Sequence, residues 1–309
     1  MDKNWISYIG NTPLVRLSRL FDNERGIAVY AKLEMLNPNG SAKDRSANRM
    51  ISAALEQGLI GPGSVIIESS SGNMAISLAA ICSRLDMRFI SVVDPKTTPQ
   101  NIRIMRAYGA DIELVQQPDP ASGEFLPARL SRVRQLVEDI PNSFWPNQYE
   151  NENNYLSHQD GTMQEIVTEL GHVDYVIGGV STCGTMLGCA SYAREHQLDT
   201  KSSLSMPQAA SFWAVRRTGA YSPGLVPALC PHLAKANLWT MPFMSRKPIW
   251  LPAAVCLCSM KRFLPGLPRA LLSLRLIACF TAYRTARYVP LFFMIVASVI
   301  WIRSTTMNG

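Results

Sequence analysis

The chain has 309 residues, of which 47% are hydrophobic and 17% are charged, and this is enough for two lobes with cores of their own. Because no signal peptide precedes its first motif, we expect a soluble, cytoplasmic protein. Its 7 cysteines form no CxxC pair and its 4 histidines never stand at metal-ligand spacing, which argues against a disulfide scaffold and a zinc site and favours reduced thiols. The net charge of +7 does not indicate a nucleic-acid arm, because the basic part has no aromatic interleaving and no binding motif.

The first 200 residues alternate short apolar runs with amphipathic stretches, a pattern that predicts an α/β fold in which helices cover both faces of a parallel sheet. The expected strands are residues 28–34, 65–67, 89–93, 112–115 and 175–177. The expected helices are one that Ser41 caps and Gly58 ends, followed by residues 74–84, 99–108, 126–138, 155–170 and 185–196.

One segment, Asn37-Pro-Asn-Gly-Ser-Ala-Lys43-Asp44-Arg45, places a lysine in the first turn of the first expected helix. Positive potential at a helix start disfavours the charged form of the amine, and so helps supply the neutral nucleophile that attacks an aldehyde. Taken alone, the Lys-Asp-Arg triplet is better explained as a solvated helix start. A second segment decides between the two interpretations.

That second segment, Ser70-Ser71-Gly72-Asn73, lies between an expected strand and an expected helix. It offers hydroxyls, backbone amides and one side-chain amide, the groups needed to hold a carboxylate beside a ring hydroxyl. Together with Lys43 it predicts a pyridoxal-phosphate site.

A third segment, Ser181-Thr182-Cys183-Gly184-Thr185, follows the strand at 175–177 and opens a helix. Its amides and hydroxyls can converge on a phosphate at the positive end of that helix. In isolation a polar strand-to-helix turn is an equally good interpretation. Beside the other two segments, a phosphate site is favoured.

These motifs and the opening Ile9-Gly-Asn-Thr-Pro-Leu-Val15 resemble the cysteine synthase and cystathionine β-synthase family of fold type II pyridoxal-phosphate enzymes over about residues 1–200. The resemblance implies a fold like that of the tryptophan synthase β subunit, with two parallel-sheet lobes and a small lobe of about residues 40–145 inserted in the large one. It also implies a homodimer that acts on small amino acids, with no nucleic acid, membrane or metal involved.

The resemblance further implies a role for each motif residue. Lys43 would be the catalytic lysine that bonds to the cofactor, and Asn73 would contact the cofactor's ring hydroxyl. Gln148 would face the substrate. The substrate carboxylate would be bound by Ser70, Ser71, Gly72, Asn73 and Met74, and the cofactor phosphate by Ser181, Thr182, Cys183, Gly184 and Thr185.

Departures from the family pattern resemble a narrower branch, the N-(2-amino-2-carboxyethyl)-L-glutamate synthases of diaminopropionate and siderophore biosynthesis. Ser181 and Cys183 replace glycines, Met74 replaces a threonine, and the segments 93–96 and 145–153 are typical of the branch. The branch implies replacement of the phosphate of O-phospho-L-serine by the amine of L-glutamate. Two alternatives stay open: a cysteine synthase that uses O-acetylserine and sulfide, and an inactive frameshifted fragment.

Cys183 carries a second expectation. Because a side chain disfavours positive φ, a residue in place of this glycine predicts either a turn that avoids positive φ or a strained loop.

The last third of the chain has a different composition. Residues 1–200 carry 17 basic and 23 acidic residues, whereas residues 201–309 carry 13 basic residues and no acidic one. The codons of Trp239-Thr-Met-Pro242, read one nucleotide earlier, force Asp and Ala, and those of Trp301–Gly309 force Asp and Glu. We therefore expect residues after about Lys201 to be an out-of-frame translation.

This C-terminal part is not expected to complete the fold. It lacks the Gly/Ser segment whose serine would approach the cofactor's ring nitrogen, although the earlier frame of residues 263–270 permits one. Its prolines are expected to prevent a strand beside residues 175–177, where the chain continues as Ser202-Ser-Leu-Ser-Met-Pro207. The apolar run 288–302 is about fifteen residues long, shorter than the roughly 18 to 20 of a membrane-spanning helix.

Overall fold

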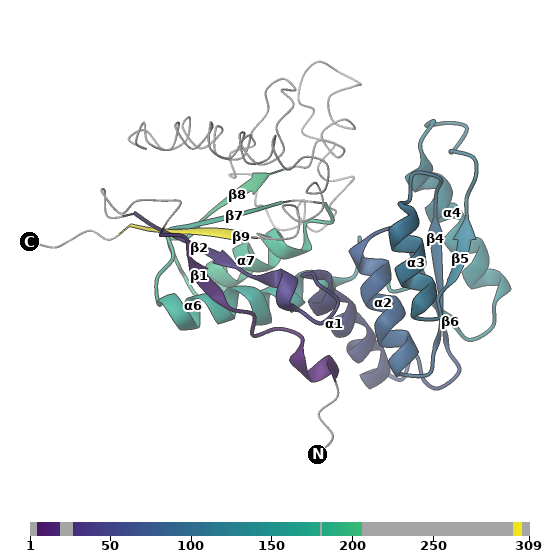
Figure 1. The fold of residues 1–309 in the computed structure, drawn as a ribbon, viewed down its shortest axis with the longest axis horizontal. Helices are drawn as coiled ribbons and strands as arrows, with labels where there is room; N and C mark the ends of the chain where they lie inside the picture. Colours follow the sequence, from purple (N-terminus) through teal and green to yellow (C-terminus); the bar gives the residue numbers. More distant parts are fainter. Residues whose placement is uncertain (1–4, 19–26, 180, 206–298, 305–309) are drawn as a thin grey trace, which may run out of the picture. The chain divides into compact units, whose positions relative to one another are not determined.

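The computed structural model describes residues 5–18, 27–179, 181–205 and 299–304 (Figure 1). The chain divides into two compact units, each with a sheet of its own. The first unit consists of Met1–Gly10 and Leu36–Ser157, and the second consists of Asn11–Met35 and His158–Gly309.

The sheet of the first unit has four strands, and all of its pairings are parallel, as expected. Parallel strands place their carboxyl ends at one edge, so the turns after β3 and β4 lie at the same edge of the sheet. In spatial order the strands are β5 (Asp111–Leu114), β4 (Arg88–Val93), β3 (Val65–Ser69) and β6 (Ser143–Phe144).

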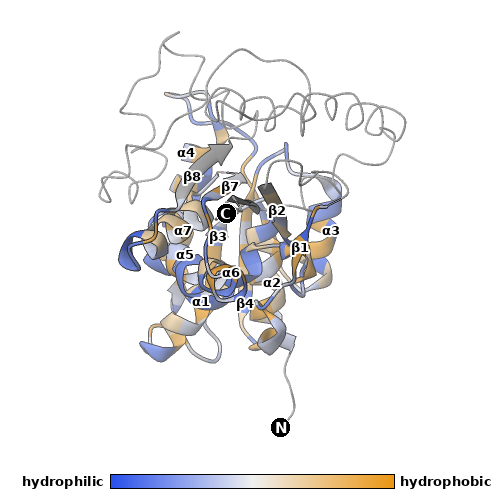
Figure 2. Ribbon diagram, turned by 90° about the vertical axis from the view of Figure 1, so that its left-hand side faces the viewer, coloured by the Kyte–Doolittle hydropathy of each residue, from blue (hydrophilic) through white to orange (hydrophobic). Residues whose placement is uncertain are grey.

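Helices cover both faces of this sheet. Figure 1 shows α2 and α3 on one side of β4 and α4 on the other. In Figure 2 the helices α1 and α3 carry both apolar and hydrophilic residues, as helices that cover a sheet require. The helices of the unit are α1 (Lys43–Glu56), α2 (Asn73–Arg84), α3 (Pro99–Ala107), α4 (Phe125–Asp139) and α5 (Glu152–Ser157).

The two faces of the sheet form two separate cores. On one face Ile66 and Phe89 pack with buried residues of α1, α2 and α3. On the other face Ile67 and Ile90 pack with Val133 of α4. Alternate residues of a strand point to opposite faces, so a strand covered on both sides must be apolar throughout, and this explains the continuous run Val65–Ile67.

The second unit has a five-stranded sheet that is mixed, where a parallel sheet was expected. Strand β7 pairs with β8 in parallel, whereas β9 lies between β2 and β7 and is antiparallel to both. In spatial order the strands are β1 (Leu14–Arg16), β2 (Ile27–Lys32), β9 (Val299–Ser304), β7 (Tyr175–Gly179) and β8 (Lys201–Ser205).

Strands β8 and β9 correct the expectation that the C-terminal part supplies no strand. The hydrogen bonds of a sheet come from backbone groups that any residue except proline provides. Neither strand contains a proline. The prolines from which we expected no pairing begin at Pro207 and lie outside both strands. The other expectations for residues 206–298 fall outside the described residues.

The helices of the second unit are α6 (Gln164–Leu170) and α7 (Gly184–Glu195). The helix expected over 155–170 is three consecutive segments, since the π-helical turn η3 (His158–Met163) separates α5 from α6. Such turns occur within longer helices, frequently at functional sites. The short 3-10 helices are η1 (Trp5–Tyr8) and η2 (Glu34–Leu36).

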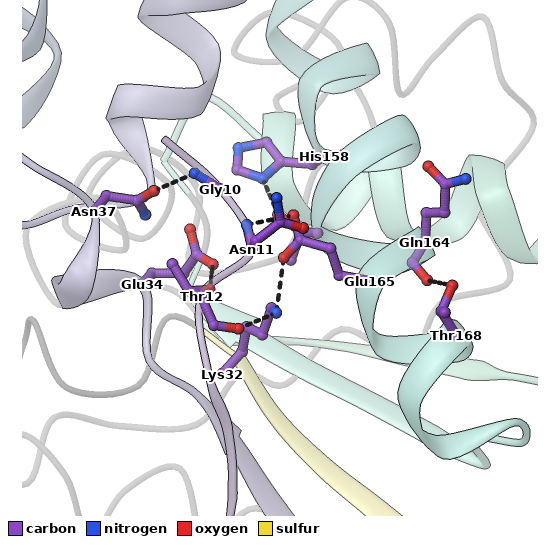
Figure 3. Close-up of polar contacts among 11 residues, drawn as sticks. Gly10, Asn11, Thr12, Lys32, Glu34, Asn37, His158, Gln164, Glu165 and Thr168 are labelled. Atoms are coloured by element: carbon purple, nitrogen blue, oxygen red, sulfur yellow. Dashed lines mark hydrogen bonds and ion pairs between the residues drawn. The ribbon is translucent and has the colours of Figure 1, made fainter. Parts of the chain in front are cut away.

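A buried ionic network anchors the opening motif within the second unit (Figure 3). Lys32, whose side chain is 1% exposed, lies 2.7 Å from the Glu165 carboxylate and donates to the Thr12 carbonyl. The Thr12 hydroxyl donates to Glu34 at 2.7 Å, and the Asn11 amide donates to Glu165 at 2.9 Å. The buried Lys32 ammonium is thus paired with Glu165, and the hydrogen bonds of Thr12 and Asn11 tie the motif to this pair and to Glu34.

The described part of the chain contains no helix with both the length and the apolar character needed to cross a bilayer. It also contains no group of three or more His, Cys, Asp or Glu residues that could hold a metal ion.

Candidate functional site

Lys43 is the first residue of α1, as the sequence predicts. Burial lowers the pKa of its amine to about 8, although part of the side chain remains accessible to solvent. Ala42, rather than Ser41, directly precedes the helix, and the Ser41 hydroxyl accepts from the Lys43 amide at 3.2 Å. A fraction of roughly one in ten of the amines is therefore neutral at pH 7, and the neutral form is the one that attacks an aldehyde.

Asp44 joins this helix start to the rest of the site. Its buried carboxylate accepts from the Asn39 backbone amide at 2.7 Å and from the Ser77 hydroxyl at 2.5 Å. Ser77 lies one turn into α2, whose first residue is Asn73. The starts of α1 and α2 are thus held together within the first unit.

The segment 70–74 forms the turn between β3 and α2. The Ser70 hydroxyl accepts from the Ala75 amide, in the first turn of α2, at 3.3 Å. Asn73 is exposed, which leaves its side chain accessible to a ligand. Met74 is buried in the core of the unit, and its side chain packs with α1 and α2. The predicted part of Met74 in binding a carboxylate therefore falls to its backbone.

Gln148 lies against this turn. Its side-chain amide donates to the Ser69 backbone carbonyl at 3.3 Å. The backbone carbonyl of Gln148 accepts from the Asn154 side-chain amide at 2.7 Å. The predicted substrate-facing residue is therefore held at the end of β3, beside the turn predicted to bind the carboxylate.

Glu68 is a fully buried carboxyl that sequence reasoning missed. It accepts hydrogen bonds from the Gln148 amide at 3.1 Å, the Ser69 amide at 2.8 Å and the Trp145 indole at 3.3 Å. Burial raises the pKa of Glu68 to about 7, and the three donors and the charge of Arg129 offset part of that effect. An acidic residue at the end of an apolar strand was the signal that could have identified it.

The segment 181–185 precedes and begins α7 in the second unit. Ser181 is exposed, and the residues from Thr182 to Thr185 are buried. Cys183 has φ of +65° directly before the helix, so the strained alternative is the correct one. Cys82 is a buried free thiol, in line with the expectation of reduced thiols.

The hydroxyl of Thr185 forms a hydrogen bond with a buried histidine. His158, buried in η3, places Nε2 3.2 Å from the Thr185 hydroxyl and Nδ1 2.9 Å from the Thr162 hydroxyl. The helix start, its amides and an oriented hydroxyl form the kind of group that binds a phosphate.

These residues fit pyridoxal phosphate on their chemistry. The first unit contains an amine of lowered pKa beside a turn of hydroxyls and amides, which suits an aldehyde and a carboxylate. The second unit contains a helix start lined with hydroxyls, which suits a phosphate. The chain thus has, in its two units, the three kinds of group that the cofactor needs.

Comparison with known proteins identifies relatives of the same kind. The family model described as "Pyridoxal-phosphate dependent enzyme" matches residues 6–237, past the expected boundary at about 201. The N-(2-amino-2-carboxyethyl)-L-glutamate synthases of Ralstonia nicotianae and Cupriavidus metallidurans are 49% and 48% identical over 193 and 191 residues. Each alignment covers 62% of this chain, and the chain spans about half the length of these relatives, 56% and 55%.

Solved structures show the same fold. A hydrogen sulfide-producing enzyme from Fusobacterium nucleatum has a TM-score of 0.62 and 34% identity, with 72% of each chain covered. O-ureido-L-serine synthase has a TM-score of 0.63 and 29% identity, over 75% of this chain and 70% of that one. These likenesses confirm the predicted fold class and cofactor. The chain belongs to the family of pyridoxal-phosphate dependent enzymes.

Proposed function

We propose that the chain replaces the phosphate of O-phospho-L-serine with the amine of L-glutamate. The Cβ–O bond to phosphate breaks, a bond forms from Cβ to the glutamate nitrogen, and the product is N-(2-amino-2-carboxyethyl)-L-glutamate. This product would serve 2,3-diaminopropionate and siderophore biosynthesis. The observation that carries the proposal is the Lys43 amine, whose pKa burial lowers to about 8, together with the bond from Asp44 to Ser77 of α2, the helix that follows the turn at 70–74.

The residues of the chain divide the work. When bound, the cofactor supplies a conjugated ring that stabilises negative charge on the substrate's α-carbon. Lys43 accepts the α-proton as a general base, for which a pKa near the working pH is suited. The turn at 70–74 and Gln148 bind the substrate carboxylate, Asn73 contacts the ring hydroxyl, and residues 181–185 hold the cofactor phosphate.

Arg129 supports phosphoserine as the donor. Its side chain on α4 is 12% exposed, and its Nε lies 3.4 Å from Asp94, which follows β4. It is close enough to Glu68 to influence the pKa of that carboxyl. This places a partly buried cation, paired with Asp94, near the edge of the sheet where β3 and the turn at 70–74 meet. A cation there would attract the dianionic phosphate of the donor and would gain little from a neutral acetyl group.

The Arg129 assignment is tested by Arg129→Gln. We expect KM for O-phospho-L-serine to rise about tenfold or more, because charged hydrogen bonds contribute roughly 1.5 to 3 kcal/mol, while KM for O-acetyl-L-serine stays within about twofold. Arg132→Gln is the control, since Arg132 lies on the same helix and pairs with Glu113 at 2.7 Å. An equal rise for both donors would refute the assignment.

The reaction itself is tested with the 309-residue chain and with the product in which one nucleotide is restored near codon 201, each supplied with cofactor. Each donor, O-phospho-L-serine or O-acetyl-L-serine, is combined with each acceptor, L-glutamate or sulfide, and products are identified by mass spectrometry. We expect the phosphoserine and glutamate pair to give the fastest turnover. Faster cysteine formation from acetylserine and sulfide would establish a cysteine synthase, and no turnover together with no visible cofactor absorbance would establish an inactive fragment.

A further inference from the structure

Three consecutive backbone carbonyls, beginning at the last residue of β3, each accept a hydrogen bond from a side chain of a different segment. The Ser69 carbonyl accepts from Gln148 at 3.3 Å, and the Ser70 carbonyl accepts from the Ser91 hydroxyl at 2.8 Å. The Ser71 carbonyl accepts from the Asn101 side-chain amide at 2.9 Å. The donors come from the segment after β6, from β4 and from the first turn of α3.

The planarity of the peptide bond gives this arrangement a consequence. In a trans peptide the carbonyl of one residue and the N–H of the next point in opposite directions. The donors to the Ser69 and Ser70 carbonyls lie on opposite sides of β3, whereas the bond from Asn101 fixes the Ser71 carbonyl and turns the Gly72 amide away from that bond. The Gly72 amide lies 3.5 Å from the Ser70 hydroxyl, directly before α2, and amides and hydroxyls at a helix start are groups that bind an anion.

We propose that Asn101 is a positioning residue for the substrate carboxylate, because it holds the Ser71–Gly72 peptide in the orientation that presents the Gly72 amide to the anion. The proposal rests on the proposed function of the turn at 70–74 as the carboxylate site. Asn101 is half-buried and separated by 30 residues from Ser71. It acts through the backbone and does not contact the reacting atoms.

Gly72 explains why such a tether is needed. Its φ of −128° and ψ of −148° lie outside the ordinary strand and helix regions, and a glycine has more conformational freedom than any other residue. Without the Asn101 tether, the Ser71–Gly72 peptide could rotate at small cost and turn its carbonyl toward the carboxylate. The tethered peptide binds the anion without that rearrangement, so its loss lowers affinity for the carboxylate and leaves the chemical step intact.

The test compares Asn101→Leu, which removes the donor at similar volume, with Thr98→Ala. Thr98 accepts from the Asn101 backbone amide at 3.3 Å, so its loss weakens the start of α3 without touching the tether. We expect Asn101→Leu to raise KM for O-phospho-L-serine about three- to tenfold, with kcat and visible cofactor absorbance within about twofold, because one neutral hydrogen bond is lost. Thr98→Ala should leave KM unchanged.

A second readout isolates the carboxylate. Titration of the cofactor-loaded, frame-restored protein with O-phospho-L-serine and with its carboxamide, followed by visible absorbance, measures binding, and the ratio of the two affinities reports carboxylate recognition. We expect Asn101→Leu to lower this ratio and Thr98→Ala to preserve it. An unchanged ratio in Asn101→Leu, or an equal fall in Thr98→Ala, would overturn the inference. Absence of turnover by the frame-restored protein would count against the proposed function, whereas the affinity ratio would still decide the role of Asn101.

Discussion

At the residue scale, one amine dominates the expected chemistry. Burial lowers the pKa of Lys43 to about 8, so roughly one amine in ten is neutral at pH 7, against fewer than about one in a thousand for an ordinary lysine. Protonation blocks attack on an aldehyde, so cofactor attachment should become faster as the pH rises through about 8 and level off above it. Visible absorbance after mixing the chain with cofactor at several pH values measures this rate.

Lys43→Ala tests the same residue directly. Removing the amine should abolish covalent attachment and turnover while leaving the fold near intact, because alanine is an excellent helix former at this helix start. Borohydride reduction followed by peptide mapping locates any attached cofactor. Lys96→Ala is the matched control and should keep attachment. A trapped adduct on another lysine would exclude Lys43 from the role we give it.

Glu68 should make stability depend on pH. Its folded-state pKa of about 7 is above the ordinary value of 4.5, so the fold favours its neutral form. This contribution is fully present below about pH 4.5 and is lost as the pH rises through about 7, a change on the order of 3 kcal/mol. Thermal unfolding from pH 5 to 8 should therefore show a steeper loss of stability in the unmodified chain than in Glu68→Gln.

The control for this pH dependence is Glu138→Gln, which changes an exposed carboxylate of α4. It should retain the slope of the unmodified chain. Parallel slopes for Glu68→Gln and the unmodified chain would mean that Glu68 remains ionised in the fold, in which case its three donors outweigh its burial.

At the element scale, the start of α7 combines a predicted phosphate site with backbone strain. Cys183 at φ of +65° occupies a conformation that costs a side-chain-bearing residue roughly 1 to 2 kcal/mol and costs glycine almost nothing. Cys183→Gly should therefore be more stable than Cys183→Ala by about 1 kcal/mol in chemical denaturation. Both variants lack the thiol, so its loss does not enter the difference. Equal stabilities would show that the loop relaxes out of the left-handed region.

Secondary-structure elements were predictable where their signals are local. The helix at Lys43–Glu56 and the strand at Val65–Ser69 follow from apolar spacing and flanking glycines within a few residues. The π-helical turn at His158–Met163 was not predictable, because its register depends on packing against α7, where Thr185 meets His158. Strand β9 was missed because a strand in a sheet is defined by partners far away in the chain.

At the scale of the whole molecule, we propose that residues after about Lys201 are read out of frame. The 309-residue chain should then be insoluble or protease-sensitive, and restoring one nucleotide near codon 201 should give a soluble, yellow enzyme. Limited proteolysis and visible absorbance of the two products side by side measure this. The family match reaches residue 237, so the frame could change later than codon 201. A second product, corrected near codon 237, is therefore compared with the first, and the more resistant and more yellow of the two shows which codon is nearer the change of frame.

The coding nucleotide sequence provides an independent check. The earlier frame should be open through this region and should encode acidic residues where residues 201–309 have none. Stop codons in that frame, or an uncorrected chain as resistant and as yellow as the corrected one, would make residues 201–309 a genuine domain. The pairing of β9 between β2 and β7 would then be part of the native sheet.

By itself, the sequence determined the fold class, the cofactor and the positions of Lys43, Asn73 and the turn before α7. These depend on short-range chemistry: a lysine, a glycine turn and a helix start are adjacent in the chain, so their spacing specifies their geometry. Only the tertiary structure decided the burial of Met74, the raised pKa of Glu68 and the bonds from Asn101 and Ser91 to the turn. Those depend on segments 20 or more residues apart, and their contacts exist only once the sheet and its helices have packed.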